Sequence, residues 1–347
     1  MSFCCVLLLF AAGCETVVEV EAPPHVPQLV AHGFFTSDGL WLVRVTHSVA
    51  YTSRDDPESV EAAIVTVLAP DGRMQTLARR DSGLFVATDL RPVAQTAYTL
   101  RVEAPGFVTT QGSDQLPEKP NVAGFTAAST VDRGRRRVVD LSFSIDDPPD
   151  TANYYGVFVV QGRWRLDVKK GTITPLTPTL FTFESDNPIF EKNPEIEFLD
   201  DDVRYYRDPF FDDTEFNGTL RDVTLRLRYQ DPDPQTDVQI WRAFALMVVS
   251  ASDNLYEYWT TANRQLTTGQ NPFAEPIRVH SNMSNGFGVF GGFQYRALPV
   301  PPDQTGLIAF CDTTTRWKAV CDSVGAPAGP QASLPVRERF LDGPITH

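Results

Sequence analysis

Short runs of alternating apolar and polar residues fill the first third of the chain and predict β-strands. In Tyr98–Ala104, Tyr, Leu and Val alternate with Thr, Arg and Glu, as in a strand that buries one face. Turn sequences at Ser37–Gly39, Pro70–Gly72 and Asp81–Gly83 separate such runs. Their spacing indicates a small β-sandwich over residues 28–115. The predicted strands are Gln28–Phe35, Trp41–Val45, Ala62–Leu68, Gln75–Arg79, Leu84–Ala87, Tyr98–Ala104 and Phe107–Thr110.

Longer strand-like runs follow a linker of low hydrophobicity at residues 115–120. They alternate or are rich in aromatic and β-branched residues, and the last two flank the turn sequence Asp231–Pro234. We expect those two to form a long antiparallel pair, within a second β-sandwich-like domain of fibronectin-like character over residues 121–347. The predicted strands here are Val138–Ile145, Tyr154–Gln161, Thr219–Tyr229 and Val238–Val249.

One segment, residues 252–266, has helical rather than strand periodicity. Its apolar residues recur at intervals of three and four, so they share one helix face. Ser252 and Asp253 suit the N-terminus of a helix, whereas Gly269 and Pro272 terminate it. We expect the aromatic residues of this face to pack on a sheet. The periodic positions are Leu255, Trp259, Ala262 and Leu266.

Composition fits this all-β picture and limits the partners. A length of 347 residues gives room for roughly two domains, and 42% of the residues are hydrophobic, which is enough to build cores. The net charge of −14 argues against nucleic-acid binding, because an acidic surface repels phosphates.

The N-terminus has the features of an export signal. Residues 3–12 are an apolar run that is too short to span a bilayer, and Ala12 and Gly13 precede Cys14 as in a lipobox. We therefore predict a lipoprotein signal peptide over residues 1–13, acylation of Cys14 as the membrane anchor, and an extended tether over residues 14–27. No Lys or Arg precedes the apolar run, and an ordinary secretory signal is the alternative.

Two cysteines near the C-terminus form an even pair once Cys14 is acylated. Cys4 and Cys5 leave with the signal peptide, so the mature chain keeps Cys311 and Cys321. In an oxidising compartment these two are expected to form a disulfide. A metal-binding pair is the alternative, although no histidine lies nearby in the sequence.

Carboxylates gather between Glu184 and Glu215, notably at Asp200–Asp202, Asp208 and Asp212–Asp213. Such a segment could supply the oxygens that Ca²⁺ prefers, but it lacks the EF-hand pattern, and a solvated acidic loop is the simpler interpretation. The five histidines form no recognised catalytic motif. We therefore predict no enzyme activity, no cofactor and no firm metal site.

Glycine is concentrated in Asn285–Gly292, where four glycines surround Phe287, Val289 and Phe290. This composition demands a tight turn or the close approach of another chain, as in a bulged hairpin or a strand that crosses the core.

Two resemblances to known families follow from these segments. Gly83–Phe85 and Tyr98–Gly106 resemble the transthyretin-like or carboxypeptidase-regulatory type of immunoglobulin-like domain. The mature chain as a whole resembles domain-of-unknown-function family 4249, outer-membrane lipoproteins of Bacteroidota. The residues that carry the second resemblance are Cys14, Leu29, Val30, Gly33, Asp212, Asp213, Phe216, Asn217, Gly218, Tyr256, Tyr258, Asn271, Pro272, Phe273, Glu275, Pro276, Ser281, Asn282, Asn285, Gly286, Gly288, Phe290, Gly291 and Gly292.

The family resemblance implies a location and a class of partner, but no catalytic residues. Its members are often encoded beside SusC-like TonB-dependent receptors, which implies a cell-surface or outer-membrane accessory protein with an unknown ligand. A structural or adhesive surface protein is the second hypothesis. A glycan hydrolase that uses Asp212 and Asp213 is the third.

Overall fold

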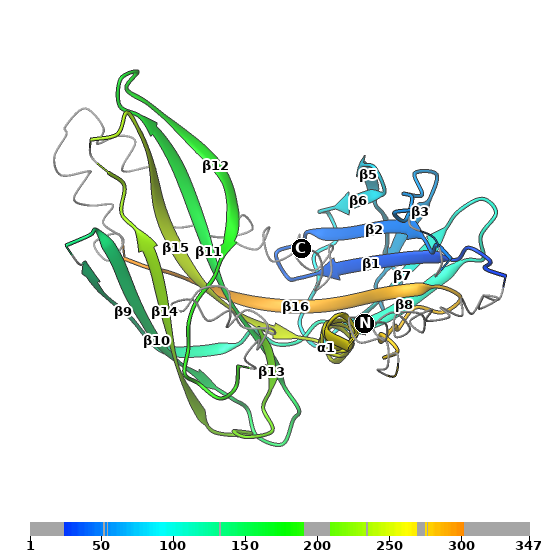
Figure 1. Cartoon of the computed structure of the whole chain (residues 1–347). Coiled ribbons are helices and arrows are strands. Elements are labelled where there is room, and N and C mark those ends of the chain that lie inside the picture. The colour runs from blue at the N-terminus through cyan, green and yellow to red at the C-terminus, as the bar shows by residue number, and fades with distance from the viewer. Residues whose placement is uncertain are drawn as a thin grey trace, which may run out of the picture.

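The computed structural model describes residues 24–50, 53, 55–131, 133–190, 209–233, 235–268, 275 and 277–301. These residues form sixteen β-strands in three sheets and one α-helix, so the predicted all-β fold class is confirmed. Figure 1 shows two groups of strands joined by the long strand β16.

The N-terminal strands follow the predicted pattern, with two differences. The predicted strand Gln75–Arg79 is divided between two sheets: β4 pairs with β3, and Leu77 N still bonds to Val65 O of β3, whereas β5 pairs with β6. The predicted strand Phe107–Thr110 is wrong: Phe107 N closes a turn onto Ala104 O, and the strand begins only at Thr110, as the unpredicted β8. The bounds are β1 Leu29–Phe35, β2 Trp41–His47, β3 Ile64–Leu68, β4 Met74–Thr76, β5 Ala78–Asp81, β6 Leu84–Ala87, β7 Ala97–Glu103 and β8 Thr110–Gln115.

The remaining elements are mostly longer and include three strands, β9, β12 and β13, that the sequence did not predict. β9 and β12 lie at sheet edges and consist mainly of small or polar residues, and β13 is a three-residue strand that pairs with β11. The bounds are β9 Asn121–Val131, β10 Arg136–Asp146, β11 Tyr154–Asp167, β12 Thr172–Phe181, β13 Phe210–Asp212, β14 Leu220–Gln230, β15 Val238–Ala251, α1 Asp253–Thr268 and β16 Phe287–Pro299.

One large sheet runs through both halves of the molecule. Its strand order is β12-β11-β15-β16-β1-β2-β6-β5, with β13 also paired to β11. β1 and β16 are parallel, in a register that joins Val30 to Phe287 and Phe35 to Gly292. The predicted division at residues 115–120 assigned the β16 segment to the second domain alone, whereas β16 also completes the sheet of the first sandwich.

Two small sheets cover one face of the large sheet, and α1 covers part of the other. On the first face, β4-β3-β7-β8 encloses one core and β14-β10-β9 encloses another. Strand β16 contributes to all three cores: Phe290 lies in the first, Leu298 packs on the second, and Val289 and Phe293 belong to the third, beneath α1. Alternate residues of a strand point to opposite faces of the sheet. One face of β16 therefore contributes to the first and second cores, and the other face contributes to the third.

The predicted hairpin of the segments 219–229 and 238–249 is wrong. β14 pairs with β10 in a small sheet, whereas β15 pairs with β11 and β16 in the large one. Burial explains the difference: β14 is buried at alternate positions, as in an outer strand, while β15 is buried on both faces beyond its first few residues.

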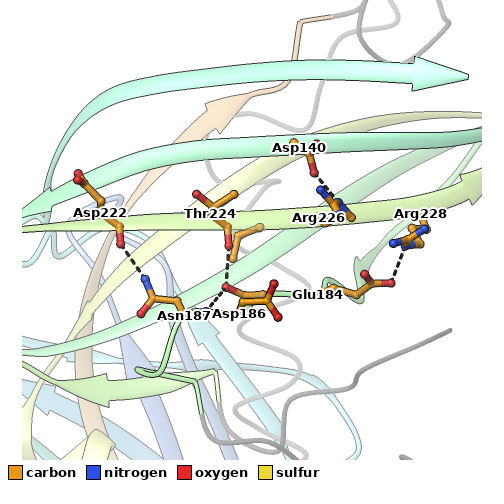
Figure 2. Close-up of a pocket in the computed structure, with 10 residues that line it drawn as sticks. Asp140, Glu184, Asp186, Asn187, Asp222, Thr224, Arg226 and Arg228 are labelled. Carbon is orange, nitrogen blue, oxygen red and sulfur yellow. Dashed lines mark hydrogen bonds and ion pairs between the residues drawn. The ribbon is translucent and has the colours of Figure 1, made fainter. Parts of the chain in front are cut away.

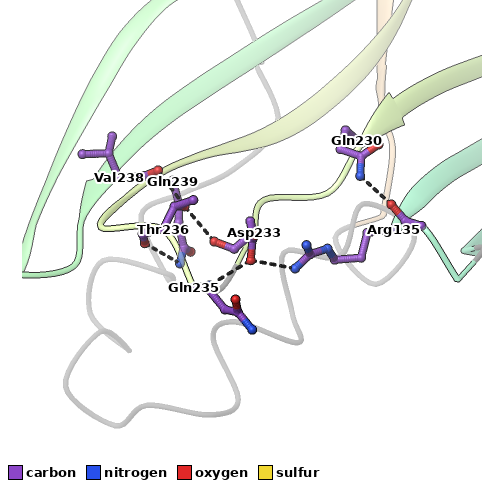
Figure 3. A network of polar contacts seen from close by, with 8 residues as sticks. Arg135, Gln230, Asp233, Gln235, Thr236, Val238 and Gln239 are labelled. Atoms are coloured by element: carbon purple, nitrogen blue, oxygen red, sulfur yellow. Dashed lines mark hydrogen bonds and ion pairs between the residues drawn. The ribbon is translucent and has the colours of Figure 1, made fainter.

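The connection between β14 and β15 therefore crosses from one sheet to the other, and the turn between β9 and β10 anchors it. Figure 3 shows Arg135 Nη1 donating to Asp233 Oδ1 (2.9 Å). Arg137 forms a second, less exposed pair with Asp231 (2.7 Å). The hydrogen bond from Arg135, together with one from Gln235 N, lowers the pKa of Asp233.

The predicted helix is confirmed as α1. Ser252 Oγ accepts the N–H of Leu255 (3.3 Å), which is the hydrogen bond of an N-cap serine. Leu255 and Trp259 are fully buried, against the large sheet. The aromatic residues thus pack in the core, as expected.

Candidate functional site

The motif residues between 212 and 218 form a turn that supports the start of β11. The buried carboxylate of Asp213 accepts hydrogen bonds from Asn153 N (2.9 Å) and Nδ2 (3.3 Å). Asn217 Oδ1 accepts the N–H of Asp150 (3.2 Å). Both side chains therefore hold the backbone of the β10–β11 connection. Phe216 lies buried in the second core.

Asp147 is a central acceptor in the same connection, and the sequence did not single it out. One oxygen of its buried carboxylate accepts the hydroxyl of Tyr155 (2.6 Å), and the other accepts the N–H of Gly218 (2.8 Å). Burial and this carboxylate raise the pKa of Tyr155. A Cβ at Gly218 would lie 2.9 Å from Pro149 Cβ, which explains the glycine.

Asp212 faces a different environment from its neighbour Asp213. Its carboxylate accepts Thr214 N (3.0 Å) and the hydroxyl of Tyr256 (3.3 Å). Burial acts to raise the pKa of Asp212, but the hydrogen bonds from Thr214 and Tyr256 outweigh it and lower the pKa. Tyr256 also stacks on Tyr154, with ring centroids 4.3 Å apart. Asp212 lines a separate small pocket of about 330 Å³.

The second group of motif residues joins β16 to β8. Asn282 Nδ2 donates to Phe290 O (2.8 Å) and Ser113 O (3.2 Å), while Asn282 Oδ1 accepts Phe290 N (2.9 Å). Ser281 Oγ accepts Met283 N, and Asn285 Nδ2 donates to Thr109 O. These contacts are those of a structural clamp.

The glycines of this group allow main chains to approach closely. Gly288 has a φ of +102°, and a Cβ there would collide with the Ala31 carbonyl of the parallel strand β1. A Cβ at Gly292 would lie 3.0 Å from Gln115 O. A Cβ at Gly286 would collide with Thr110 Oγ1, and one at Gly291 would lie 2.9 Å from Leu255 Cβ of α1. Of the two interpretations of this segment, the strand that crosses the core is confirmed.

A buried carboxylate, Asp114, connects the clamp to the helix. Asp114 Oδ2 accepts Gly292 N (2.7 Å), and Oδ1 accepts Asn254 Nδ2 (2.7 Å). Asn254 Oδ1 lies 3.1 Å from His280 Nε2. Burial raises the pKa of Asp114, against the hydrogen bonds from Ser252 and Asn254. The network joins four separate segments of the chain.

Both motif groups are hydrogen-bonded to residues that line one groove, the inter-sandwich groove: Asp213 to Asn153, and Asn282 to Ser113. Its volume is about 1110 Å³, and it is open to solvent. One wall comes from residues 113–121, at the end of β8 and the following linker. The other comes from residues 146–155 and from residues 250–254, at the start of α1. The sequence did not predict this groove, because its walls come together only in the folded chain.

A second depression, the ion-paired pocket, lies on the second sandwich (Figure 2). It has a volume of about 440 Å³. Two of the four acidic residues that line it are paired with arginines: Asp140 with Arg226 (2.7 Å) and Glu184 with Arg228 (2.8 Å). Asp222, a third, accepts the hydroxyl of Ser144 (2.6 Å).

Several predicted residues lie outside the described part of the chain. Glu275 is described and exposed. Among the residues that the structure describes, no group of three or more His, Cys, Asp or Glu could hold a metal ion, and no helix has the length and hydropathy to cross a membrane. The predicted positions that are not described are Cys14, Cys311, Cys321, Asn271, Pro272, Phe273, Pro276, Asp200–Asp202 and Asp208.

Comparison with known proteins gives a family model that matches most of the chain. A family model described as Domain of unknown function (DUF4249) matches residues 15–297. No curated protein matches the chain.

The solved structures that the chain matches include three of low sequence identity. A two-domain fibronectin type-III segment of chicken tenascin is 13% identical, with 65% of this chain and 90% of that one covered and a TM-score of 0.19. A Salmonella alpha-2-macroglobulin mutant is 9% identical, with 82% and 15% covered and a TM-score of 0.19. Bovine butyrophilin is 7% identical, with 65% and 91% covered and a TM-score of 0.18.

Proposed function

We propose that this chain, which belongs to the DUF4249 family, is an outer-membrane lipoprotein exposed at the cell surface. In this proposal it acts as a non-catalytic accessory or substrate-binding partner of a TonB-dependent transporter. The observation that carries the proposal is the lipobox-like sequence Ala12–Gly13–Cys14 after a short apolar run. Lipid on Cys14 would hold the folded β-sheet part of the chain at a membrane surface, with residues 15–27 as a tether.

The polar groups around the groove support a binding role over a catalytic one. Asp213 and Asp147 accept backbone N–H groups, and Asn282 clamps β16 to β8. Asp212 and Asp213 receive different donors from different parts of the fold. These bonds account for the motif residues as architecture, whereas a nucleophile would need a positioned base. The open groove is then the natural place for a ligand or a partner segment.

The anchor is tested with Cys14→Ala and a matched control, Cys5→Ala, in the native host. The first variant should lose labelling by radioactive palmitate and leave the membrane fraction, because no acyl chain remains to hold it. The second should retain both, since Cys5 lies in the signal sequence. Membrane retention of an unlabelled Cys14→Ala protein would contradict the lipid anchor.

The transporter partnership is tested by purifying the full chain from gently solubilised membranes. We expect a TonB-dependent receptor to co-purify with the wild-type chain, and deletion of the gene to reduce uptake of that receptor's substrate. Absence of any such receptor would overturn the partnership. Deletion that left uptake intact but altered attachment or envelope integrity would favour the structural or adhesive alternative.

A further inference from the structure

The inter-sandwich groove is acidic, and its carboxylates are not neutralised by ion pairs. Its lining includes Asp114, Glu118, Asp146, Asp147 and Asp253. None of these five forms a salt bridge within the described part of the chain. Lys119 is the one cationic residue among the described residues that line the groove.

Neutral donors hold three of these carboxylates, Asp114, Asp146 and Asp147, in place. Asn121 Nδ2 donates to Asp146 Oδ2 (2.6 Å), and Tyr155 donates to Asp147. Asn254 donates to Asp114. Neutral donors fix the orientation of a carboxylate without cancelling its charge, so the groove keeps a negative potential that its low-dielectric walls concentrate.

The walls also offer apolar surface between the charges. Pro117 and Pro120 line one side, and Pro148 and Pro149 line the other, near the ring of Tyr154. The methylene stems of Lys and Arg pack on such surfaces while their charged ends reach nearby carboxylates. The volume, about 1110 Å³, far exceeds that of a single ion and slightly exceeds that of a typical small-molecule pocket.

We propose that the inter-sandwich groove binds an extended, lysine- or arginine-rich polypeptide segment of a partner protein. Glu118, Asp146 and Asp253 are exposed and meet the basic side chains, whereas Asp114 and Asp147 are buried and shape the walls. Nucleic acid and acidic glycans are repelled by the same charges. The inference concerns the groove alone and holds whether or not the partner is a transporter.

The test measures anisotropy of a fluorescein-labelled peptide of alternating lysine and serine on the purified full chain. The wild-type chain should bind this peptide, bind matched glutamate–serine and glycine–serine peptides far less, and lose affinity as salt rises. Glu118→Gln/Asp146→Asn/Asp253→Asn should weaken binding about tenfold or more, because three exposed charge contacts are lost.

A control variant, Glu58→Gln/Glu61→Gln/Glu215→Gln, removes the same charge from exposed sites that pair with His47, Arg79 and Arg221. It should bind almost as the wild-type chain does. Equal weakening by both triple variants would show a general charge effect and overturn the proposal. So would equal binding of the neutral peptide, or no binding of the basic one. Since no receptor is present, these outcomes leave the proposed transporter role to its own test.

Discussion

The inter-sandwich groove and the ion-paired pocket are both rich in carboxyl groups, yet the fold balances their charges differently. In the pocket, Asp140 and Arg226 are direct cross-strand partners of β10 and β14, so strand register brings the two charges together. The groove carboxylates lie mostly on strand ends and connections, and neutral donors hold them. A count of acidic residues therefore does not identify a binding surface, because their partners decide how much charge remains.

The largest difference between the two regions should appear in stability. Asp114→Ala leaves the N–H of Gly292 and the amide of Asn254 without their acceptor in a buried place, and should lower the free energy of unfolding by about 3 kcal/mol. Asp140→Ala breaks a half-exposed ion pair and should cost about 0.5 kcal/mol or less. Urea denaturation of both variants and of the wild-type chain measures these losses in the free energy of unfolding. Similar losses would mean that the two carboxylates are equivalent after all.

The second difference concerns pH. Burial raises the pKa of folded Asp114 above the ordinary value of 3.8, so ionisation is less favourable in the folded chain. The contribution of Asp114 to stability is therefore full below the unfolded pKa and declines as pH rises through the folded pKa.

Two asparagine variants test this sign. The stability of the wild-type chain relative to Asp114→Asn should fall as pH rises above about 4, by about 1 kcal/mol per unit of pKa shift. For Asp212, whose pKa is lowered, the corresponding difference from Asp212→Asn should rise with pH over the region below 3.8. Urea unfolding at a series of pH values gives both curves. Parallel curves would contradict the opposite environments of the two residues.

The smallest expected effect tests whether ion pairing is what keeps the ion-paired pocket from binding a basic peptide. Arg226→Gln/Arg228→Gln leaves Asp140 and Glu184 without their cations. The variant should gain a weak additional site for the lysine–serine peptide, about two- to fivefold above the background binding of the wild-type pocket, as expected for exposed charges. Peptide titration of this variant in the Glu118→Gln/Asp146→Asn/Asp253→Asn background isolates the pocket. If no binding appears there, a feature other than charge distinguishes the groove.

Local patterns in the sequence predicted elements better than their partners. The alternation in Tyr98–Ala104 and the spacing of Leu255 and Trp259 correctly indicated β7 and α1, because burial of one face leaves a periodic trace. Strand pairing leaves no such trace. The turn sequence between β14 and β15 suggested a hairpin, but both faces of β15 are buried and place it in the large sheet.

The candidate site was less accessible to prediction. Its motif residues were recognised from the family resemblance. Their structural role is visible only in the folded chain, where Asn282 is hydrogen-bonded to Phe290 and Asp213 to Asn153. Asp114 was missed because its partners lie 140 and 178 residues away. One sequence signal was present: Asp114 occupies an inward position of the alternating run Thr110–Gln115, where a polar residue needs a buried partner.

The parallel pairing of β1 with β16 also dictates the order in which the chain can fold. Ser37 Oγ bonds to Gln294 Oε1 across 257 residues, and contacts of such separation form late because a long loop must close first. During synthesis, β1 therefore has no β16 to pair with until residues 287–292 have been made. A chain interrupted before residue 287 would leave that edge of β1 unpaired and prone to aggregation.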